Sequence, residues 1–302
     1  MEFLLRGPLV VHGFAEADSW GSRKMSHRFE SCLLALLAVA CAKQPDQQAE
    51  PIQQQAADLQ YVGSSTIGQG AMPELVTVFK QRTGIKFSTV KISGSVEGFK
   101  AAMAGETPIA GMSRGLKPSE KELNPYIEVI GYDAIAVFVN ERNPITNLTK
   151  EQIKSLFAGT IKDWKGVGAT PGPVELVTER NDGHRATIQF FQESVLEGAP
   201  FAKALEIELP LDEVRYVVGH REAVTFASFV FLQRGAKMVK VNGVSPSEAT
   251  IRSGEYPLVR PLLLVSKEPP QGNAKKFFDF VLSPEGQAIV GRNFVPRSAP
   301  KG

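Results

Sequence analysis

The sequence predicts an α/β protein with a largely parallel sheet. Short apolar segments that alternate or form compact runs, as strands do, are repeatedly followed by segments with helical spacing of apolar residues. Loops rich in glycine, serine and threonine stand where a predicted strand ends and a predicted helix begins. This order is typical of βα units, in which ligands bind at the carboxyl edge of the sheet.

The first predicted elements lie between residues 59 and 139. The expected strands cover residues 59–62, 85–92, 108–112, 127–130 and 134–139. The expected helices cover residues 72–81, 96–104 and 119–123. The chain of 302 residues is long enough for two lobes that each have a core, and these elements would build most of the first.

Residues 140–144 look like a crossing into a second lobe. Thr149 is a good N-cap for the helix that follows it, with Glu151 in the first turn. The later expected helices cover residues 149–157, 185–196 and 273–282, and the later strands cover residues 174–178, 214–218 and 262–265. We expect lobe 1 to comprise residues 59–139 and 233–302, and lobe 2 to comprise residues 140–232.

The composition excludes several classes of function. Hydrophobic residues make up 43% and charged residues 22%, with a formal net charge of +2, which does not suggest nucleic acid as a partner. The two cysteines, Cys32 and Cys41, lie near the start of the chain, and the four histidines lack the spacing of a zinc site. We therefore expect no disulfide framework, no metal centre and no cofactor.

A secretory signal peptide is predicted over residues 25–41. A short basic region after Met25 leads into an apolar stretch and then into Ala38-Val39-Ala40-Cys41. The apolar stretch is too short to cross a bilayer core of ~30 Å. The last four residues resemble a bacterial lipoprotein processing site, so we expect Cys41 to be lipidated. A plain signal peptide cut nearby is the alternative.

Residues 1–24 stand upstream of this signal, so we expect Met25 rather than Met1 to be the initiator. Residues 42–58 are rich in glutamine and alanine, and we expect them to form a flexible tether before the folded part begins near Leu59. A tethered lipoprotein of this kind would lie in the periplasm, anchored to a membrane.

Four polar segments at strand-to-helix junctions form the candidate site. Helix N-termini present unpaired N–H groups, glycine permits close approach of the backbone, and arginine adds a forked cationic donor. These groups suit a tetrahedral oxyanion, although each segment alone would read as a helix cap or a surface ion pair. The candidate residues are Ser64, Ser65, Thr66, Gly94, Ser95, Ser113, Arg114, Arg180, Asp182, His184 and Arg185.

At these residues the sequence resembles the phosphate-binding proteins of bacterial phosphate ABC transporters, within the type II periplasmic binding superfamily. The similarity runs from about Leu59 to Pro296. It rests on residues 63–66, 92–98, 109–114, 148–159, 163–164, 261–262 and 277–287. The resemblance implies a two-lobed α/β fold with a ligand cleft between the lobes and two crossover strands. It also implies a monomeric binding protein, not an enzyme, that delivers inorganic phosphate to the membrane permease of an ABC transporter.

The loop over residues 180–186 departs from the family pattern. The family usually has Arg-x-Asp-Gly-Ser-Gly-Thr, whereas this chain has Arg-Asn-Asp-Gly-His-Arg-Ala. Two hydroxyl-bearing positions are lost, and Arg185 adds a positive charge. Phosphate near neutral pH carries a proton, so a buried carboxylate acceptor would favour it over fully ionised sulfate. We expect Asp182 to be that acceptor.

Three alternatives are compatible with the same residues. The changed loop would suit a binder or sensor of another oxyanion, such as sulfate, molybdate or tungstate. A ligand-free protein that serves in protein contacts would explain the lost hydroxyls. A secreted phosphatase using Asp182, His184 and a nearby serine is an alternative from a different class, but the chain has no Gly-x-Ser-x-Gly elbow and no metal-ligand cluster.

Overall fold

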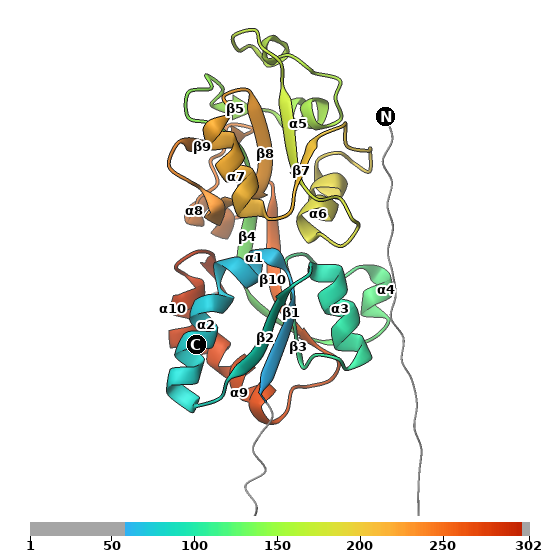
Figure 1. Ribbon diagram of the computed structural model, residues 1–302, viewed down its shortest axis with the longest axis vertical. Helices are drawn as coiled ribbons and strands as arrows, with labels where there is room; N and C mark the ends of the chain where they lie inside the picture. The colour runs from blue at the N-terminus through green and yellow to red at the C-terminus, as the bar shows by residue number, and fades with distance from the viewer. Residues whose placement is uncertain (1–57, 298–302) are drawn as a thin grey trace, which may run out of the picture. The chain divides into compact units, whose positions relative to one another are not determined.

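The computed structural model describes residues 58–297, and it begins with three parallel strands and four helices (Figure 1). These elements are β1 (Leu59–Gly63), α1 (Ser65–Gly70), α2 (Met72–Thr83), β2 (Phe87–Ile92), α3 (Ser95–Ala104), β3 (Ile109–Met112) and α4 (Pro118–Lys121). Strand β1 lies between β2 and β3 and is parallel to both. Gly63 pairs with Gly111, so the loops that follow β1 and β3 start side by side.

Two long antiparallel strands, β4 (Tyr126–Asn140) and β10 (Val259–Ser266), connect this group with the rest of the sheet. The expected break between residues 130 and 134 is wrong, because β4 is one strand of 15 residues. Residues 131–133 lack an apolar pattern but remain paired with β10.

The second group of elements follows β4. It consists of β5 (Asn147–Leu148), α5 (Lys150–Phe157), η1 (Trp164–Val167), β6 (Glu175–Glu179), α6 (Ala186–Ser194), β7 (Leu205–Ile207), α7 (Pro210–Gly219), β8 (Ala223–Ser228), η2 (Phe229–Phe231), β9 (Ala236–Val241) and α8 (Glu248–Arg252). The expected strand over residues 214–218 is wrong, since these residues lie in α7. Pro210 opens that helix and Asp212 and Glu213 occupy its first turn, which are the signals of a helix start.

The last elements are α9 (Gly272–Leu282), α10 (Pro284–Val290) and β11 (Val295–Pro296), and they return to the first group. Along the sheet the strand order is β2-β1-β3-β10-β4-β8-β6-β7. The first core forms where α2 and α9 pack on β1 and β10, with Phe79 and Phe277 in edge-to-face contact at a centroid distance of 5.2 Å. We call the elements around this core the first half of the described chain.

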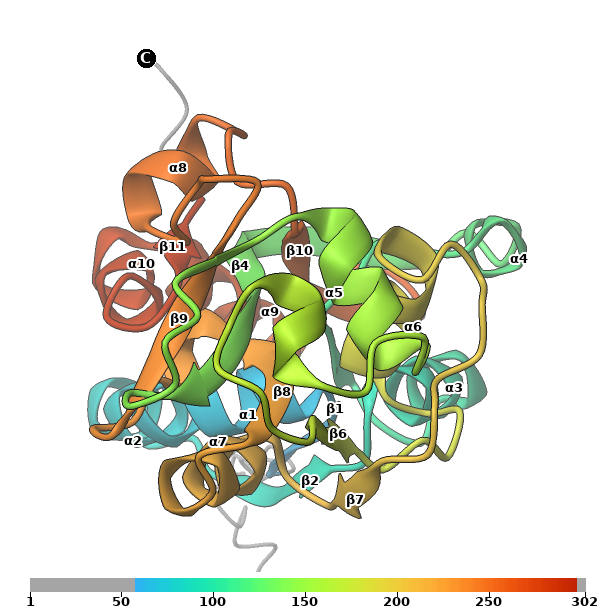
Figure 2. The ribbon, with the colours of Figure 1, turned by 90° about the horizontal axis from the view of Figure 1, so that it is seen from above.

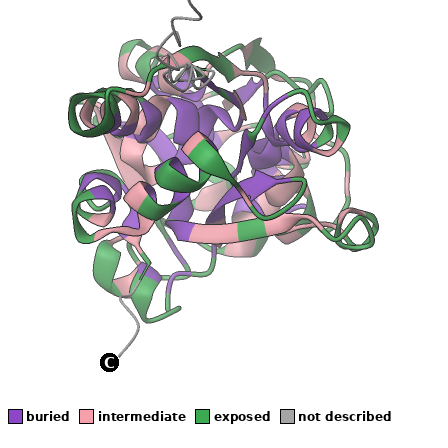
Figure 3. Ribbon diagram, turned by 90° about the horizontal axis from the view of Figure 1, so that it is seen from below, coloured by how far each residue is buried: buried purple, intermediate pink, exposed green. Residues whose placement is uncertain are grey.

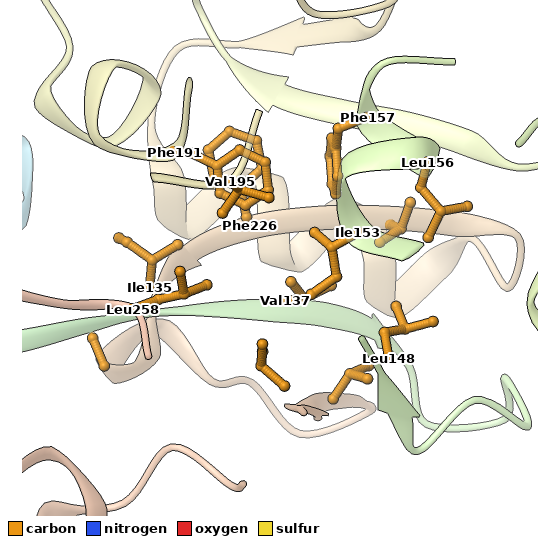
Figure 4. Packing of buried hydrophobic residues seen from close by; sticks show 14 of the residues in the cluster. Ile135, Val137, Leu148, Ile153, Leu156, Phe157, Phe191, Val195, Phe226 and Leu258 are labelled. Atoms are coloured by element: carbon orange, nitrogen blue, oxygen red, sulfur yellow. The ribbon is translucent and has the colours of Figure 1, made fainter. Parts of the chain in front are cut away.

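The second core lies on one face of β4 and β8 (Figure 4). Phe191 of α6 stacks on Phe226 of β8 with ring centroids 3.6 Å apart and an interplanar angle of 12°. Helices α5 and α6 cover this face, and α7 covers the opposite one (Figure 2). The elements from β5 to α8 form the second half.

The chain returns to the first half later than expected. Residues of β9, α8 and the segment after it pack into the second core, namely Val239, Val241, Ile251, Tyr256 and Leu258. The reason is that β9 pairs with the far end of β4 and with β5. Residues 236–258 therefore accompany the second half, whereas the sequence placed everything after residue 232 in lobe 1.

Buried residues are concentrated in the strands, between helices whose outer turns are exposed (Figure 3). Within residues 58–297 no helix combines the length and the apolar character that a membrane span requires. The predicted signal peptide, Cys41 and most of the tether fall outside the described residues.

Candidate functional site

Three loops of the first half bring three buried serines together. The hydroxyl of Ser64 donates to Oγ of Ser113 over 2.9 Å, and the N–H of Ser113 donates to Oγ of Ser95 over 3.1 Å. The parallel pairing of β1 with β3 causes this meeting, because their carboxyl ends lie at the same edge of the sheet. Ser95 also opens α3, where the first N–H groups lack acceptors within the helix.

The second half contributes Glu179, the last residue of β6. Its side chain is 1% exposed, and Oε1 accepts a hydrogen bond of 3.1 Å from the hydroxyl of Ser65 in α1. The same oxygen accepts a longer bond of 3.4 Å from Nη1 of Arg185. Glu179 thus joins the two halves at the point where their polar loops meet.

Arg185 precedes α6 and is 4% exposed. Besides Glu179 it pairs with Glu208, and its Nε lies 3.6 Å from Oδ2 of Asp182. Within the described residues, Nε of Arg185 and Oε2 of Glu179 are buried without a hydrogen-bond partner. Arg185 and Glu179, which pair with each other, thus each keep one buried polar atom without a hydrogen bond in the described part of the chain, although Arg185 is also ion-paired with Asp182 and Glu208.

Burial governs the protonation of the carboxyl groups here. Burial raises the pKa of Glu179 to about 7, although Arg185 and Ser65 oppose the shift. Glu213 of α7 interacts electrostatically with Glu179 and is fully buried, and its Oε2 accepts a bond of 2.7 Å from the hydroxyl of Thr225. Burial and the charge of Glu179 raise the pKa of Glu213 well above its ordinary value.

A second buried ion pair lies between the long strands. Arg260 of β10 and Asp133 of β4 face each other in the antiparallel register and are both 0% exposed, with Nη2 and Oδ2 2.8 Å apart. The hydroxyl of Ser228 donates to Asp133. Burial raises the pKa of Asp133, and the neighbouring Arg260 and Ser228 oppose that shift.

Gly94 permits the close approach of the two halves. Its φ of +91° lies in the left-handed region, and a Cβ atom there would stand 2.4 Å from the carbonyl oxygen of His184. That carbonyl also accepts a bond of 3.4 Å from the N–H of Val96. The glycine predicted from the sequence is thus a point of contact between the halves.

Seven of the eleven predicted residues are buried where the polar loops meet: Ser64, Ser65, Thr66, Gly94, Ser95, Ser113 and Arg185. Arg114 is buried nearby, where Nε donates to Gln189 of the second half over 3.0 Å. Its two terminal nitrogens, however, both bind the carboxylate of Glu120 over 2.7 Å. The charge of Arg114 is therefore already compensated.

The other three predicted residues lie toward the outside. Arg180 is largely exposed and pairs with Glu208 over 2.8 Å. Oδ1 of Asp182 accepts a hydrogen bond of 2.9 Å from the N–H of His184, which is the pattern of an Asx turn. The ring of His184 is 39% exposed, and its Nδ1 lies 3.0 Å from Oε1 of Glu97.

Several buried polar residues of the site were not predicted from the sequence: Asp133, Glu179, Thr187, Glu213, Ser228 and Arg260. Only Glu179 carried a usable signal, because an acid at the carboxyl end of a buried strand points into the edge where ligands bind. Within the described part of the chain, no group of three or more histidine, cysteine, aspartate or glutamate side chains could hold a metal ion.

Comparison with known proteins agrees with this fold. A family model described as the PBP superfamily domain matches residues 48–285. The phosphate-binding protein PstS of Staphylococcus epidermidis is 28% identical over 264 residues, which cover 79% of this chain and 78% of that protein. Protein SphX of Synechococcus elongatus is 28% identical over 302 residues, covering 91% and 87% of the two chains.

Solved structures give the same result. A Clostridium perfringens substrate-binding protein assigned to a phosphate ABC transporter, with bound phosphate, matches with a TM-score of 0.74 and 29% identity, over 80% of this chain and 100% of that one. An ABC-type phosphate transport receptor from Vibrio cholerae has a TM-score of 0.68 over 78% and 98% of the chains, and at 24% identity it supports the fold alone. The two-lobed α/β fold expected from the resemblance is confirmed.

Proposed function

Because this chain belongs to the PBP superfamily domain family, we propose that it is a solute-binding protein that captures inorganic phosphate for the membrane permease of an ABC transporter. The names of its relatives support this proposal, since PstS proteins and the Clostridium perfringens protein are described as phosphate-binding. A similar tetrahedral oxyanion is the alternative ligand.

One observation carries the proposal: Arg185 and Glu179, which pair where the halves meet, each keep a buried polar atom that makes no hydrogen bond among residues 58–297. Nε–H of Arg185 can donate a hydrogen bond to an anionic oxygen, and Oε2 of Glu179 can accept a hydrogen bond. Monoprotonated phosphate offers both an acceptor oxygen and a donor hydroxyl. The serines of the first half and the first turn of α3 add neutral donors around the same place.

We assign the acceptor role to Glu179 rather than to Asp182. Glu179 is buried and faces Ser65, whereas one oxygen of Asp182 is already bonded to its own loop and the side chain is 30% exposed. An ionised Glu179 would accept a hydrogen bond from the hydroxyl of monoprotonated phosphate. It would repel sulfate, which carries no proton and cannot donate such a bond.

The ligand would bind by closure of two lobes about the long strands. The packing supports lobe 1 from residues 59–133 and 259–297 and lobe 2 from residues 134–258, with β4 and β10 as the crossover strands. Opening at this boundary would break the bond between Ser65 and Glu179 and admit the anion.

The setting in the cell is part of the proposal. A lipidated Cys41 would anchor a monomeric protein to a membrane in the periplasm, with residues 42–58 as the tether between the anchor and the folded part. We propose that the protein binds its ligand, which sets aside the ligand-free alternative. We also propose that it releases the ligand unchanged, which sets aside the phosphatase.

Calorimetric titration with a panel of anions tests the function. The protein is unfolded and refolded to remove bound ligand, then titrated with phosphate, arsenate, sulfate and molybdate. Tight binding of phosphate and arsenate with weak binding of sulfate is expected. Tighter binding of another anion would reassign the ligand, silence with every anion would favour the ligand-free alternative, and hydrolysis of a chromogenic phosphate ester would favour the phosphatase.

A further inference from the structure

Arg260 holds one threonine from each half of the protein. Its Nη2 donates to Oγ1 of Thr66 in α1 over 2.9 Å, and its Nη1 donates to Oγ1 of Thr187 in α6 over 3.1 Å. All three side chains are buried, with exposed fractions of 0% for Arg260, 1% for Thr66 and 2% for Thr187. One guanidinium group therefore spans the boundary between the halves.

Asp133 fixes the guanidinium in place. Its Oδ2 accepts from Nε of Arg260 over 2.9 Å and lies 2.8 Å from Nη2, while Ser228 donates to its other oxygen. The pairing of the Asp133 carboxylate with the planar guanidinium fixes one orientation of the Arg260 side chain. The two groups also neutralise each other's charge. Arg260 is thus poorly suited to serve as the cation for a ligand, and its donors are directed at the two threonines.

Each threonine hydroxyl still has a proton to donate. A hydroxyl group carries one donor hydrogen, and both oxygens already accept from Arg260. Among residues 58–297 neither hydroxyl donates to a protein acceptor. Buried donors are seldom left without an acceptor, because this costs free energy.

The two threonines adjoin the candidate site. Thr66 follows Ser65, which bonds to Glu179, and Thr187 lies two residues after Arg185, which pairs with Glu179. Thr187 is in the first turn of α6, a helix of nine residues whose N-cap residue makes no side-chain cap bond. An oxyanion held between Arg185 and Ser65 would supply the missing acceptors.

We propose that Arg260 is a positioning residue that aims the hydroxyls of Thr66 and Thr187 at the bound oxyanion, one from each half. The inference rests on the proposed function and adds Thr187 to the ligand-binding residues. Arginine is required at this position because a lysine ammonium cannot bridge both hydroxyls while it stays paired with Asp133.

Valine substitutions test the hydroxyls with little change of shape. Three proteins are made from the full-length sequence and processed by the expression host: the wild type, Thr66→Val and Thr187→Val. Each is titrated with inorganic phosphate. Each variant is expected to bind phosphate about 10-fold more weakly or worse. Thr107→Val is the matched control, since that buried hydroxyl donates to backbone carbonyls of Gln60 and Ile109, and its affinity should stay within about twofold of wild type.

Arg260→Lys tests the positioning role, because it keeps the charge beside Asp133 and so avoids an unpaired buried carboxylate. It is expected to weaken binding, and Thr187→Val is expected to add little in the Arg260→Lys background. If the affinity of the double variant falls by the product of the fold-changes in the two single variants, the positioning role of Arg260 is overturned. Wild-type affinity in both valine variants would overturn the inference while leaving the proposed function intact, whereas a wild-type protein that binds none of the anions would overturn the function itself.

Discussion

The hydroxyl of Ser65 donates to Oε1 of Glu179 over 3.1 Å, and this bond links α1 of the first half to the end of β6 in the second. Glu179 is buried because the halves meet there, and burial raises its pKa to about 7. Separation of the halves would expose the carboxyl group and return its pKa toward the ordinary value. Closure and protonation of this one group are therefore linked.

Stability should decrease as the pH rises through the range set by Glu179. Between its ordinary pKa of 4.5 and about 7, the folded protein keeps a proton that the unfolded chain has released. The contribution is complete below 4.5 and is lost above about 7, with a size on the order of 3 kcal/mol or less. Denaturant unfolding from pH 4.5 to 8 should show a shallower decline in Glu179→Gln.

Exposed Glu106→Gln is the matched control for this experiment, because it removes a carboxylate that is not buried. Its unfolding free energy should follow the wild-type curve. Equal slopes in wild type and Glu179→Gln would show that Glu179 is not the group responsible.

The same substitution should alter anion selectivity. Glutamine keeps an acceptor oxygen but removes the charge that repels a fully ionised ligand, so sulfate should gain on phosphate by about 10-fold or more. Competition calorimetry of Glu179→Gln measures the ratio of the two affinities. An unchanged ratio would return the acceptor role to another carboxylate, with Asp182→Asn as the next variant.

Arg185 and Arg114 should behave differently. Arg185→Ala removes a buried donor that makes no hydrogen bond within the described residues, and it should weaken phosphate binding by roughly 1.5–3 kcal/mol. In Arg114→Ala the main loss is the pair with Glu120, so we expect about 1–3 kcal/mol less stability and a smaller change in affinity. Titration and unfolding of both variants check this, and the reverse ranking of affinities would show that the anion binds near Arg114.

A side chain at position 94 should hinder closure. In Gly94→Ala the new Cβ would collide with the carbonyl oxygen of His184, and the φ of +91° would be strained. We expect a folded protein with at least about 10-fold weaker phosphate binding, measured beside Gly219→Ala, where a Cβ meets nothing within 4 Å. If Gly94→Ala and Gly219→Ala bind phosphate with equal affinity, the loops that contain Gly94 and His184 need not come together for binding.

The parts of the site that follow one strand could be predicted, because a strand, a polar loop and a helix are contiguous in sequence. Ser64 and Ser65 after β1 and Ser95 before α3 are of this kind. Arg260 and Asp133 could not be predicted, since they are 127 positions apart and meet only through the antiparallel register of β10 and β4.

Two errors have similar physical causes. The valines of residues 214–218 suggested a strand by their preference for extended backbone, but the proline and acids before them favoured the helix that forms. The return to lobe 1 was placed too early because β9 is joined to the second core by pairing with β4, a long-range contact that local patterns do not record.

The most direct test of the central claim is a crystal structure of the protein with bound arsenate, whose anomalous scattering locates the anion. We predict arsenate between the two halves, within hydrogen-bond distance of Arg185, Glu179 and the hydroxyls of Ser65, Thr66 and Thr187. An anion bound elsewhere, or a protein that crystallises at saturating arsenate with the bond between Ser65 and Glu179 intact and no anion beside it, would contradict the claim.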